Sequence, residues 1–184
     1  QGHTFPKITR ARVMTENAYE AAISAPNLTD EERRNLALTL AWSKAYGDLD
    51  NIEHFCNFYA DSTEIYTPLQ NWYWAKHGHS SQPWQDGEIA IAELFSHREE
   101  KIVSIVAQGN SVAVHMAVEI TDKGGQSRQG AFAAFLKFDA DGKITSDHSF
   151  VGRHPRPTPD QGPPAYRSMI EKLEKINPQG TSEG

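Results

Sequence analysis

The chain has 184 residues, of which 38% are hydrophobic and 23% charged, and its formal net charge is −6 at pH 7. These values predict one globular domain with a sizeable core. The basic residues are scattered, which argues against a nucleic-acid partner. No apolar run approaches the roughly 20 residues of a membrane span, which argues against a membrane partner. Cys56 is the only cysteine, which excludes an internal disulfide, and the first residues lack the apolar region of a signal peptide, so we expect a cytoplasmic protein.

The first third of the chain is predicted to be mainly helical. Helices are expected at residues 9–24, 31–46 and 50–59, followed by a short strand at 62–67. Thr29 and Glu32 have the spacing of a capping box, in which a threonine and a glutamate three residues later bond to each other's backbone amides. Pro26 and Pro68 are expected to end the first helix and the strand.

The segment 69–85 is rich in aromatic residues but shows no periodicity, so we predict a long loop. Its large aromatic side chains are expected to line a pocket for a flat or aromatic ligand; they are Trp72, Tyr73, Trp74 and Trp84. His77 and His79 are candidate proton donors above the pocket mouth. Alternatively, this loop lies on the outside of the protein or at a subunit contact. No third ligand with suitable spacing accompanies the histidines, so we expect no metal site and no cofactor.

The rest of the chain is predicted to be mostly strands. A helix is expected at 87–97, strands at 101–108, 110–121, 130–138 and 143–151, and a short helix at 166–176. Helices followed by antiparallel strands indicate an α+β fold with helices packed on one face of a curved sheet. We expect an N-terminal extension (1–28), a central domain (29–154) and a proline-rich C-terminal tail (155–184).

The last predicted hairpin places an acid on a rigid strand. We expect a tight turn ending at Gly142, which can adopt a positive φ. The predicted register sets Asp147 opposite Ala134 in a small apolar niche, with Thr145 on the same face. Because side chains alternate along a strand, Asp147 and His148 point to opposite faces. Either of them is a candidate acid or base if its face lines a cavity.

Short sequence motifs resemble those of a known family. The runs YGDLD (46–50), FYADST (58–63) and IYTP (65–68) resemble the opening of a SnoaL-like domain, and FDADGKI (138–144) resembles its closing hairpin. SnoaL-like domains belong to the nuclear transport factor 2-like superfamily. The resemblance implies a cone-shaped α+β barrel with an apolar pocket, and it implies that Asp147 faces inward.

The same resemblance implies a cofactor-independent enzyme. Asp147 would move a proton in a hydrophobic, aromatic or polycyclic oxygenated molecule, with Tyr66 or a loop histidine polarising its carbonyl or hydroxyl group. Aldol-type cyclisation or cleavage, dehydration and isomerisation all use this chemistry, so the enzyme would be a lyase or an isomerase. Further expected substrate contacts are Met116, Val118, Arg128, Phe132 and Ser149.

Two other functions remain open at this point. One is a non-catalytic module of the same fold that binds a small molecule or a peptide. The other, weaker, is an epoxide hydrolase, for which Asp147 and Arg128 would form part of the required acid–arginine cluster.

A homodimer is also expected from the hairpin. The face opposite Asp147 is apolar in the predicted register, and an exposed apolar face calls for a partner surface. Its predicted members are Ala131, Ala133, Phe135, Ile144 and Phe150.

Overall fold

A computed structural model describes residues 15–67, 72–74, 81–153 and 168. The helices are α1 (Thr15–Ile23), α2 (Asp30–Gly47), the 3-10 helix η1 (Leu49–Asn51), α3 (Ile52–Cys56) and α4 (Gln82–Ala92). The strands are β1 (Tyr59–Thr67), β2 (Trp72–Trp74), β3 (Phe95–Gln108), β4 (Ser111–Asp122), β5 (Ser127–Phe138) and β6 (Ile144–Arg153).

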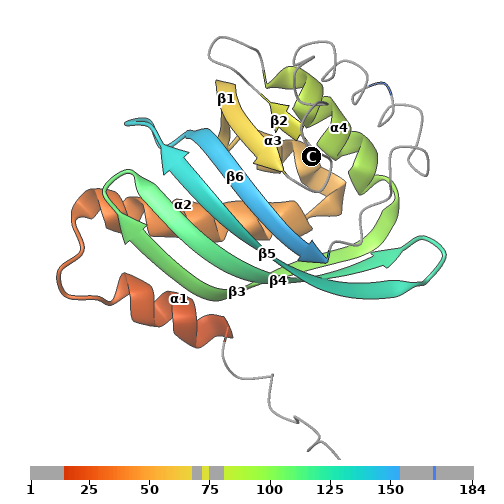
Figure 1. The fold of residues 1–184 in the computed structure, drawn as a ribbon. Helices are drawn as coiled ribbons and strands as arrows, with labels where there is room; N and C mark the ends of the chain where they lie inside the picture. The colour runs from red at the N-terminus through yellow and green to blue at the C-terminus, as the bar shows by residue number, and fades with distance from the viewer. Residues whose placement is uncertain (1–14, 68–71, 75–80, 154–167, 169–184) are drawn as a thin grey trace, which may run out of the picture.

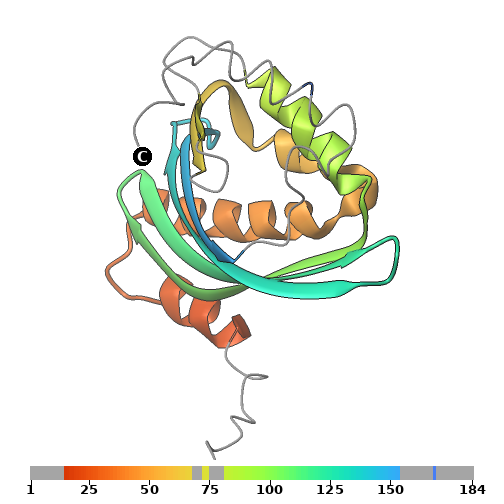
Figure 2. The same cartoon turned by 45° about the vertical axis from the view of Figure 1, so that its right-hand side comes forward.

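The six strands form one curved sheet in the order β2-β1-β6-β5-β4-β3. Strands β1 and β6 pair in parallel, whereas the other neighbours are antiparallel. The sheet curves around α2, while α3 and α4 lie together near β1 (Figures 1 and 2). This arrangement confirms the predicted α+β class, with a sheet that curves like a cone but does not close. No helix in the described part of the chain is long and apolar enough to cross a membrane.

The predicted capping box at the start of α2 is present. The Thr29 amide donates to Glu32 Oε2 over 2.8 Å, and the Glu32 amide donates to Thr29 Oγ1 over 3.2 Å. The other carboxylate oxygen of Glu32 accepts from the Gly109 amide at 3.0 Å. The cap therefore also ties α2 to the turn between β3 and β4.

Two helix boundaries differ from the sequence prediction. The helix expected at 50–59 ends at Cys56, and Tyr59 already belongs to β1. The helix expected at 87–97 is shifted toward the N-terminus, because Pro83 fits the first helical turn and Phe95 already pairs with β4. The expected loop 69–85 contains β2 and the start of α4, so the prediction of a loop is wrong for these two parts.

The register of the last hairpin also needs correction. Asp147 lies opposite Leu136, not Ala134, because an irregularity at Thr145 shifts the pairing between β5 and β6. The same shift turns Ile144 inward, where it is fully buried, instead of onto the outer face. Gly142 does have the expected positive φ, at 79°.

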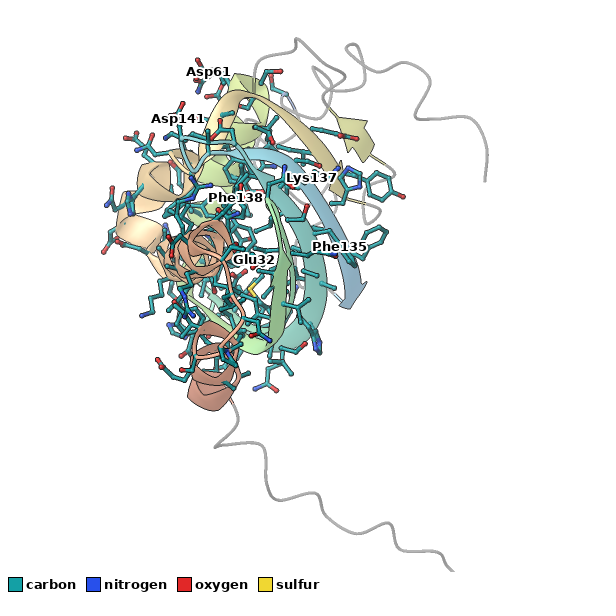
Figure 3. The ribbon with its side chains drawn as sticks, turned by 90° about the vertical axis from the view of Figure 1, so that its left-hand side faces the viewer. Glu32, Asp61, Phe135, Lys137, Phe138 and Asp141 are labelled. Atoms are coloured by element: carbon teal, nitrogen blue, oxygen red, sulfur yellow. The ribbon has the colours of Figure 1, made fainter. Side chains whose placement is uncertain are left out.

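The core lies between the concave face of the sheet and the helices. Alternate residues of β4, from Val112 to Ile120, are buried there. On the convex face, Phe135 and Phe150 are the exposed large apolar side chains of the last hairpin, at 52% and 45% exposure. Figure 3 shows Phe135 pointing away from the helices.

Candidate active site

Asp147 is a buried acid on the concave face of β6. Its backbone lies between Leu136 of β5 and Ile65 of β1, and the residue is only 5% exposed. Two hydroxyl groups donate hydrogen bonds to its carboxylate. Tyr59 Oη bonds to Oδ2 at 2.8 Å, and Ser149 Oγ bonds to Oδ1 at 2.6 Å.

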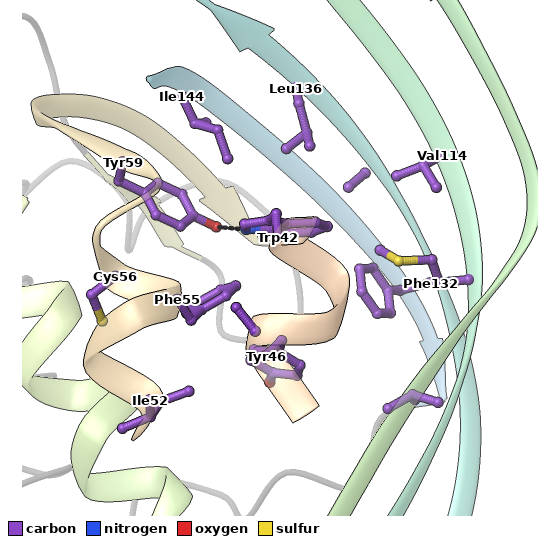
Figure 4. Packing of buried hydrophobic residues seen from close by; sticks show 14 of the residues in the cluster. Trp42, Tyr46, Ile52, Phe55, Cys56, Tyr59, Val114, Phe132, Leu136 and Ile144 are labelled. Atoms are coloured by element: carbon purple, nitrogen blue, oxygen red, sulfur yellow. Dashed lines mark hydrogen bonds between the residues drawn. The ribbon is translucent and has the colours of Figure 1, made fainter. Parts of the chain in front are cut away.

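A tryptophan fixes the direction of the bond between Tyr59 and Asp147. Trp42 Nε1 donates to Tyr59 Oη over 2.9 Å, as the dashed line in Figure 4 shows. An indole N–H can only donate, so the tyrosine oxygen accepts from Trp42 and directs its own proton to the carboxylate. The three side chains come from α2, β1 and β6, and they meet inside the cone.

The surroundings of Asp147 favour its protonated form. Burial raises the pKa of this carboxyl group above its ordinary value, and the negative charge of Glu88 raises it further. The hydrogen bonds from Ser149 and Tyr59, together with the His148 charge, act in the opposite direction but do not cancel the effect of burial. A carboxyl group with a raised pKa is suited to take up and release protons near neutral pH.

Tyr59 stays a neutral hydrogen-bond donor. Burial raises the pKa of its phenol well above 10.0, and the neighbouring Asp147 charge adds to this shift. The phenol therefore keeps its proton at neutral pH. Tyr59 also lines a cavity of about 810 Å³ between α3, β1 and the start of α4, but Asp147 does not.

Aromatic rings form a continuous wall beside this network (Figure 4). The ring of Phe55 is central, with its centroid 4.8 Å from that of Tyr46 and 5.5 Å from that of Tyr59. Trp84 of α4 packs on Tyr59 at 4.4 Å. Trp84 is 6% exposed, so this aromatic residue belongs to the core. These rings fill the core on one side of the Asp147 network.

Three charged or polar residues of this region were missed by the sequence prediction. Tyr59 was assigned to a helix, so its position beside Asp147, 88 residues away in sequence, was not foreseen. Glu88 is 3% exposed although it is an acid, and it lies one turn after Trp84 on the buried side of α4. Arg98 is 2% exposed on β3. The strand β3 was predicted to start at residue 101, which left Arg98 outside any predicted strand.

Asp147 and His148 lie on opposite faces of β6. His148 lies on the opposite side of β6, where its Nε2 is 3.1 Å from Glu64 Oε1. The ring of Tyr66 packs against His148 and Phe150 on the same side, at 5.7 and 5.6 Å. Tyr66 therefore lies on the opposite face of the sheet from the Asp147 network.

The other expected site residues fall into three groups. Met116, Val118 and Phe132 are buried on the concave face. Arg128 is exposed near the start of β5, where it contacts Gln126. The candidates outside the described residues, or with side chains that are not described, are His77, His79, Trp72, Tyr73 and Trp74. Among the described residues, no cluster of three or more histidine, cysteine or acidic side chains has the geometry of a metal site.

Comparisons with known proteins show similarity in structure alone. No family model and no curated protein matches the sequence. A protein from Acidithiobacillus ferrooxidans with a polyketide cyclase assignment matches over 77% of this chain and 95% of its own, at TM-score 0.56 and 14% identity. A SnoaL-like protein from Jannaschia sp. CCS1, also assigned as a polyketide cyclase, covers 69% and 91% at TM-score 0.55 and 12% identity. An NTF2-like protein from Anabaena variabilis covers 71% and 98% at TM-score 0.52 and 13% identity.

Proposed function

We propose that this chain, which has the fold of the SnoaL-like proteins in the nuclear transport factor 2-like superfamily, is an acid/base enzyme with Asp147 as its proton-transfer group. The observation that carries the proposal is the buried Asp147 carboxyl group, which has a raised pKa and is held by two hydroxyl donors. Acids with perturbed pKa values cluster at functional sites because catalysis needs such groups there. A buried acid with a structural role is usually paired with a cation.

The proposed step is the removal of a proton from a carbon next to a carbonyl group. The Asp147 carboxylate takes the proton, and the C–H bond breaks while a new O–H bond forms. The electron pair moves onto the carbonyl oxygen and gives an enolate. Tyr59 and Ser149 hold the carboxylate in one orientation, which fixes the position of the proton acceptor. Returning the proton elsewhere gives isomerisation, and attack of the enolate on a second carbonyl gives aldol-type cyclisation.

The aromatic wall supports the proposed substrate class. The rings of Phe55 and Trp84 pack on Tyr59, which bonds to the acid, so the surroundings of Asp147 are apolar and aromatic. Such surroundings match a hydrophobic, aromatic or polycyclic molecule that carries oxygen at the reacting position. The epoxide hydrolase alternative lacks this support, because Arg128 is exposed on β5 and is not a partner of Asp147.

Proton exchange gives the most direct test of the proposed function. A panel of polycyclic and aromatic ketones is incubated with the protein in D₂O, and loss of the α-proton signal is followed by NMR. We expect Asp147→Asn to slow exchange by about 10²- to 10⁴-fold, the usual contribution of a positioned acid or base. Tyr59→Phe keeps the ring but removes the donor, and we expect a smaller loss. Asp141→Asn, in the exposed turn before β6, should have no effect.

Two outcomes would contradict the proposal. Undiminished exchange in the Asp147→Asn variant would show that Asp147 does not transfer the proton. Tight binding of panel members without any exchange in the unmodified protein would instead favour the non-catalytic binding module.

A further inference from the structure

Arg98 is a buried arginine whose guanidinium group is only partly bonded. It lies on the concave face of β3, where its backbone pairs with Ile120. Its Nε donates to the carbonyl oxygen of Tyr46 over 2.6 Å, and its guanidinium carbon lies 3.4 Å from the centroid of the Tyr46 ring. Its terminal nitrogens Nη1 and Nη2 are buried and have no hydrogen-bond partner among the described residues.

Such an arrangement is costly for the folded protein alone. A buried hydrogen-bonding group without a partner costs about 1–3 kcal/mol, and a charged group costs more. Native proteins contain few groups of this kind, and a bound ion or ligand is a common reason for one. The stacking on Tyr46 holds the guanidinium plane in place but does not satisfy the in-plane N–H donors.

The neighbouring acids do not fill the vacant donor positions. Glu100 lies on the same face two residues along β3, yet neither terminal nitrogen of Arg98 hydrogen-bonds to it. Glu99 pairs with Lys101 at 3.0 Å. The two nitrogens therefore have no acceptor among the described residues.

Arg98 also borders empty space. It helps to line a cavity of about 540 Å³ between α1, α2 and β3. Apolar side chains from all three elements contribute to the lining, namely Tyr19, Leu40 and Ile102. The charged residues of the lining balance, with Arg98, Lys44 and Lys101 on one side and Glu20, Glu99 and Glu100 on the other. The donors that lack a partner belong to Arg98, so a small apolar molecule with one negative group fits beside this side chain.

We propose that Arg98 is the anchor of a second binding site, which takes the carboxylate of a small apolar organic acid. A carboxylate matches the planar fork of Nη1 and Nη2, with two parallel hydrogen bonds of the charge-assisted kind. The apolar part of the acid lies against the side chains that line the cavity. This site shares no residue with the Asp147 network, so it does not depend on the proposed enzymatic function.

Benzoate serves as the probe, because it combines a carboxylate with a compact apolar ring. Its affinity is measured by NMR titration of the full chain and compared with that of benzamide, which has nearly the same shape without the charge. We expect benzoate to bind at least about tenfold more tightly, since hydrogen bonds to charged groups contribute about 1.5–3 kcal/mol. We also expect the Nε–H signal of Arg98 to shift on addition of benzoate.

Variants distinguish the effect of Arg98 on benzoate binding from the effect of the overall charge of the protein. Arg98→Gln should weaken benzoate binding by about tenfold or more, whereas Arg98→Lys, which keeps the charge but loses the fork, should give an intermediate affinity. Lys137→Gln changes the net charge equally at an exposed position on β5 and should leave the affinity unchanged.

Several results would overturn the inference. These are equal affinities of benzoate and benzamide for the unmodified protein, no binding of benzoate, or binding that moves other signals but not that of Arg98. The comparison of the two ligands needs no variant, so the inference stays testable even if Arg98→Gln does not fold. None of these results bears on proton exchange at Asp147.

Discussion

At the scale of single residues, Asp147 is held by groups that are far apart in the sequence. Alternation along a strand predicted that Asp147 and His148 face opposite ways, and the structure shows Asp147 inside. No local pattern could predict its partners, because Trp42 and Tyr59 meet it only through the packing of α2 and β1 against β6. The acid was therefore predictable from the sequence, whereas its hydrogen-bond network was not.

Glu88 should control the pH at which Asp147 becomes a base. Its negative charge raises the pKa of Asp147, so Glu88→Gln should lower that pKa. Other groups that act on Asp147 are Tyr59 and Ser149 as donors and His148 as a weak positive influence. Base-dependent proton exchange rises as pH passes through the pKa of the base. We therefore expect the rising limb of the pH–rate profile to move to lower pH in Glu88→Gln.

The control for this pH shift is the residue directly after the same helix. Glu93 directly follows α4 and is exposed, so Glu93→Gln should leave the rising limb where it is. A limb that stays fixed in Glu88→Gln, or moves to higher pH, would show that Glu88 does not act on Asp147.

Burial of Asp147 should also make stability depend on pH. Its pKa is raised in the folded state, so folding favours the protonated form. This contribution is complete below the ordinary pKa of an aspartate and is lost as pH rises through the raised value. We expect urea denaturation to show that, as the pH rises from about 4 to 7, the free energy of unfolding falls less for Asp147→Asn than for the unmodified protein. Parallel stability curves for the two proteins would contradict the raised pKa.

At the scale of elements, the local capping signal of α2 was easier to predict than strand pairing. The capping box at Thr29 and Glu32 was predicted correctly because it needs only four consecutive residues. The predicted register of β5 against β6 was wrong because Thr145 is an extra residue that shifts the pairing. The alternating sequence pattern does not reveal such an extra residue. This error moved Ile144 to the wrong face and paired Asp147 with Ala134.

The cap of α2 should contribute measurably to stability. Thr29→Ala removes the side-chain acceptor for the Glu32 amide and should reduce the free energy of unfolding by about 1 kcal/mol. Urea denaturation followed by circular dichroism measures this change. Ser24→Ala, at an exposed position after α1, is the matched control and should change stability little. An equal loss in both variants would rule out a specific effect of the cap.

At the scale of the whole molecule, the short motifs were enough to predict the fold. The motifs that resemble the opening of a SnoaL-like domain extend from the end of α2 through β1, and the motif that resembles its closing hairpin spans the turn into β6. These segments become neighbours in the sheet, since β1 pairs with β6. The segment 69–85 was harder to predict, because β2 and α4 are defined by pairing with β1 and by burial of Trp84 rather than by periodicity.

The convex face of the sheet supports our proposal of a homodimer. Phe135 and Phe150 pack edge to face at 5.8 Å and remain exposed, and Tyr66 extends the patch. An exposed aromatic patch of this kind favours burial against a second copy. We expect light scattering after size-exclusion chromatography to give a dimer for the unmodified protein and a monomer for Phe135→Lys.

The control variant for the dimer places the same charge outside the patch. Ala140→Lys changes an exposed residue in the turn before β6 and should leave the dimer intact. A monomeric unmodified protein, or a Phe135→Lys variant that remains dimeric, would exclude this interface.

The pKa of Asp147 itself tests the central claim most directly. The carboxyl carbon of this residue is followed by ¹³C NMR as a function of pH, and its signal is identified by its loss in Asp147→Asn. The buried network predicts a midpoint clearly above the ordinary value of 3.8. A midpoint at or below 3.8 would contradict a proton-transfer role for this carboxyl group.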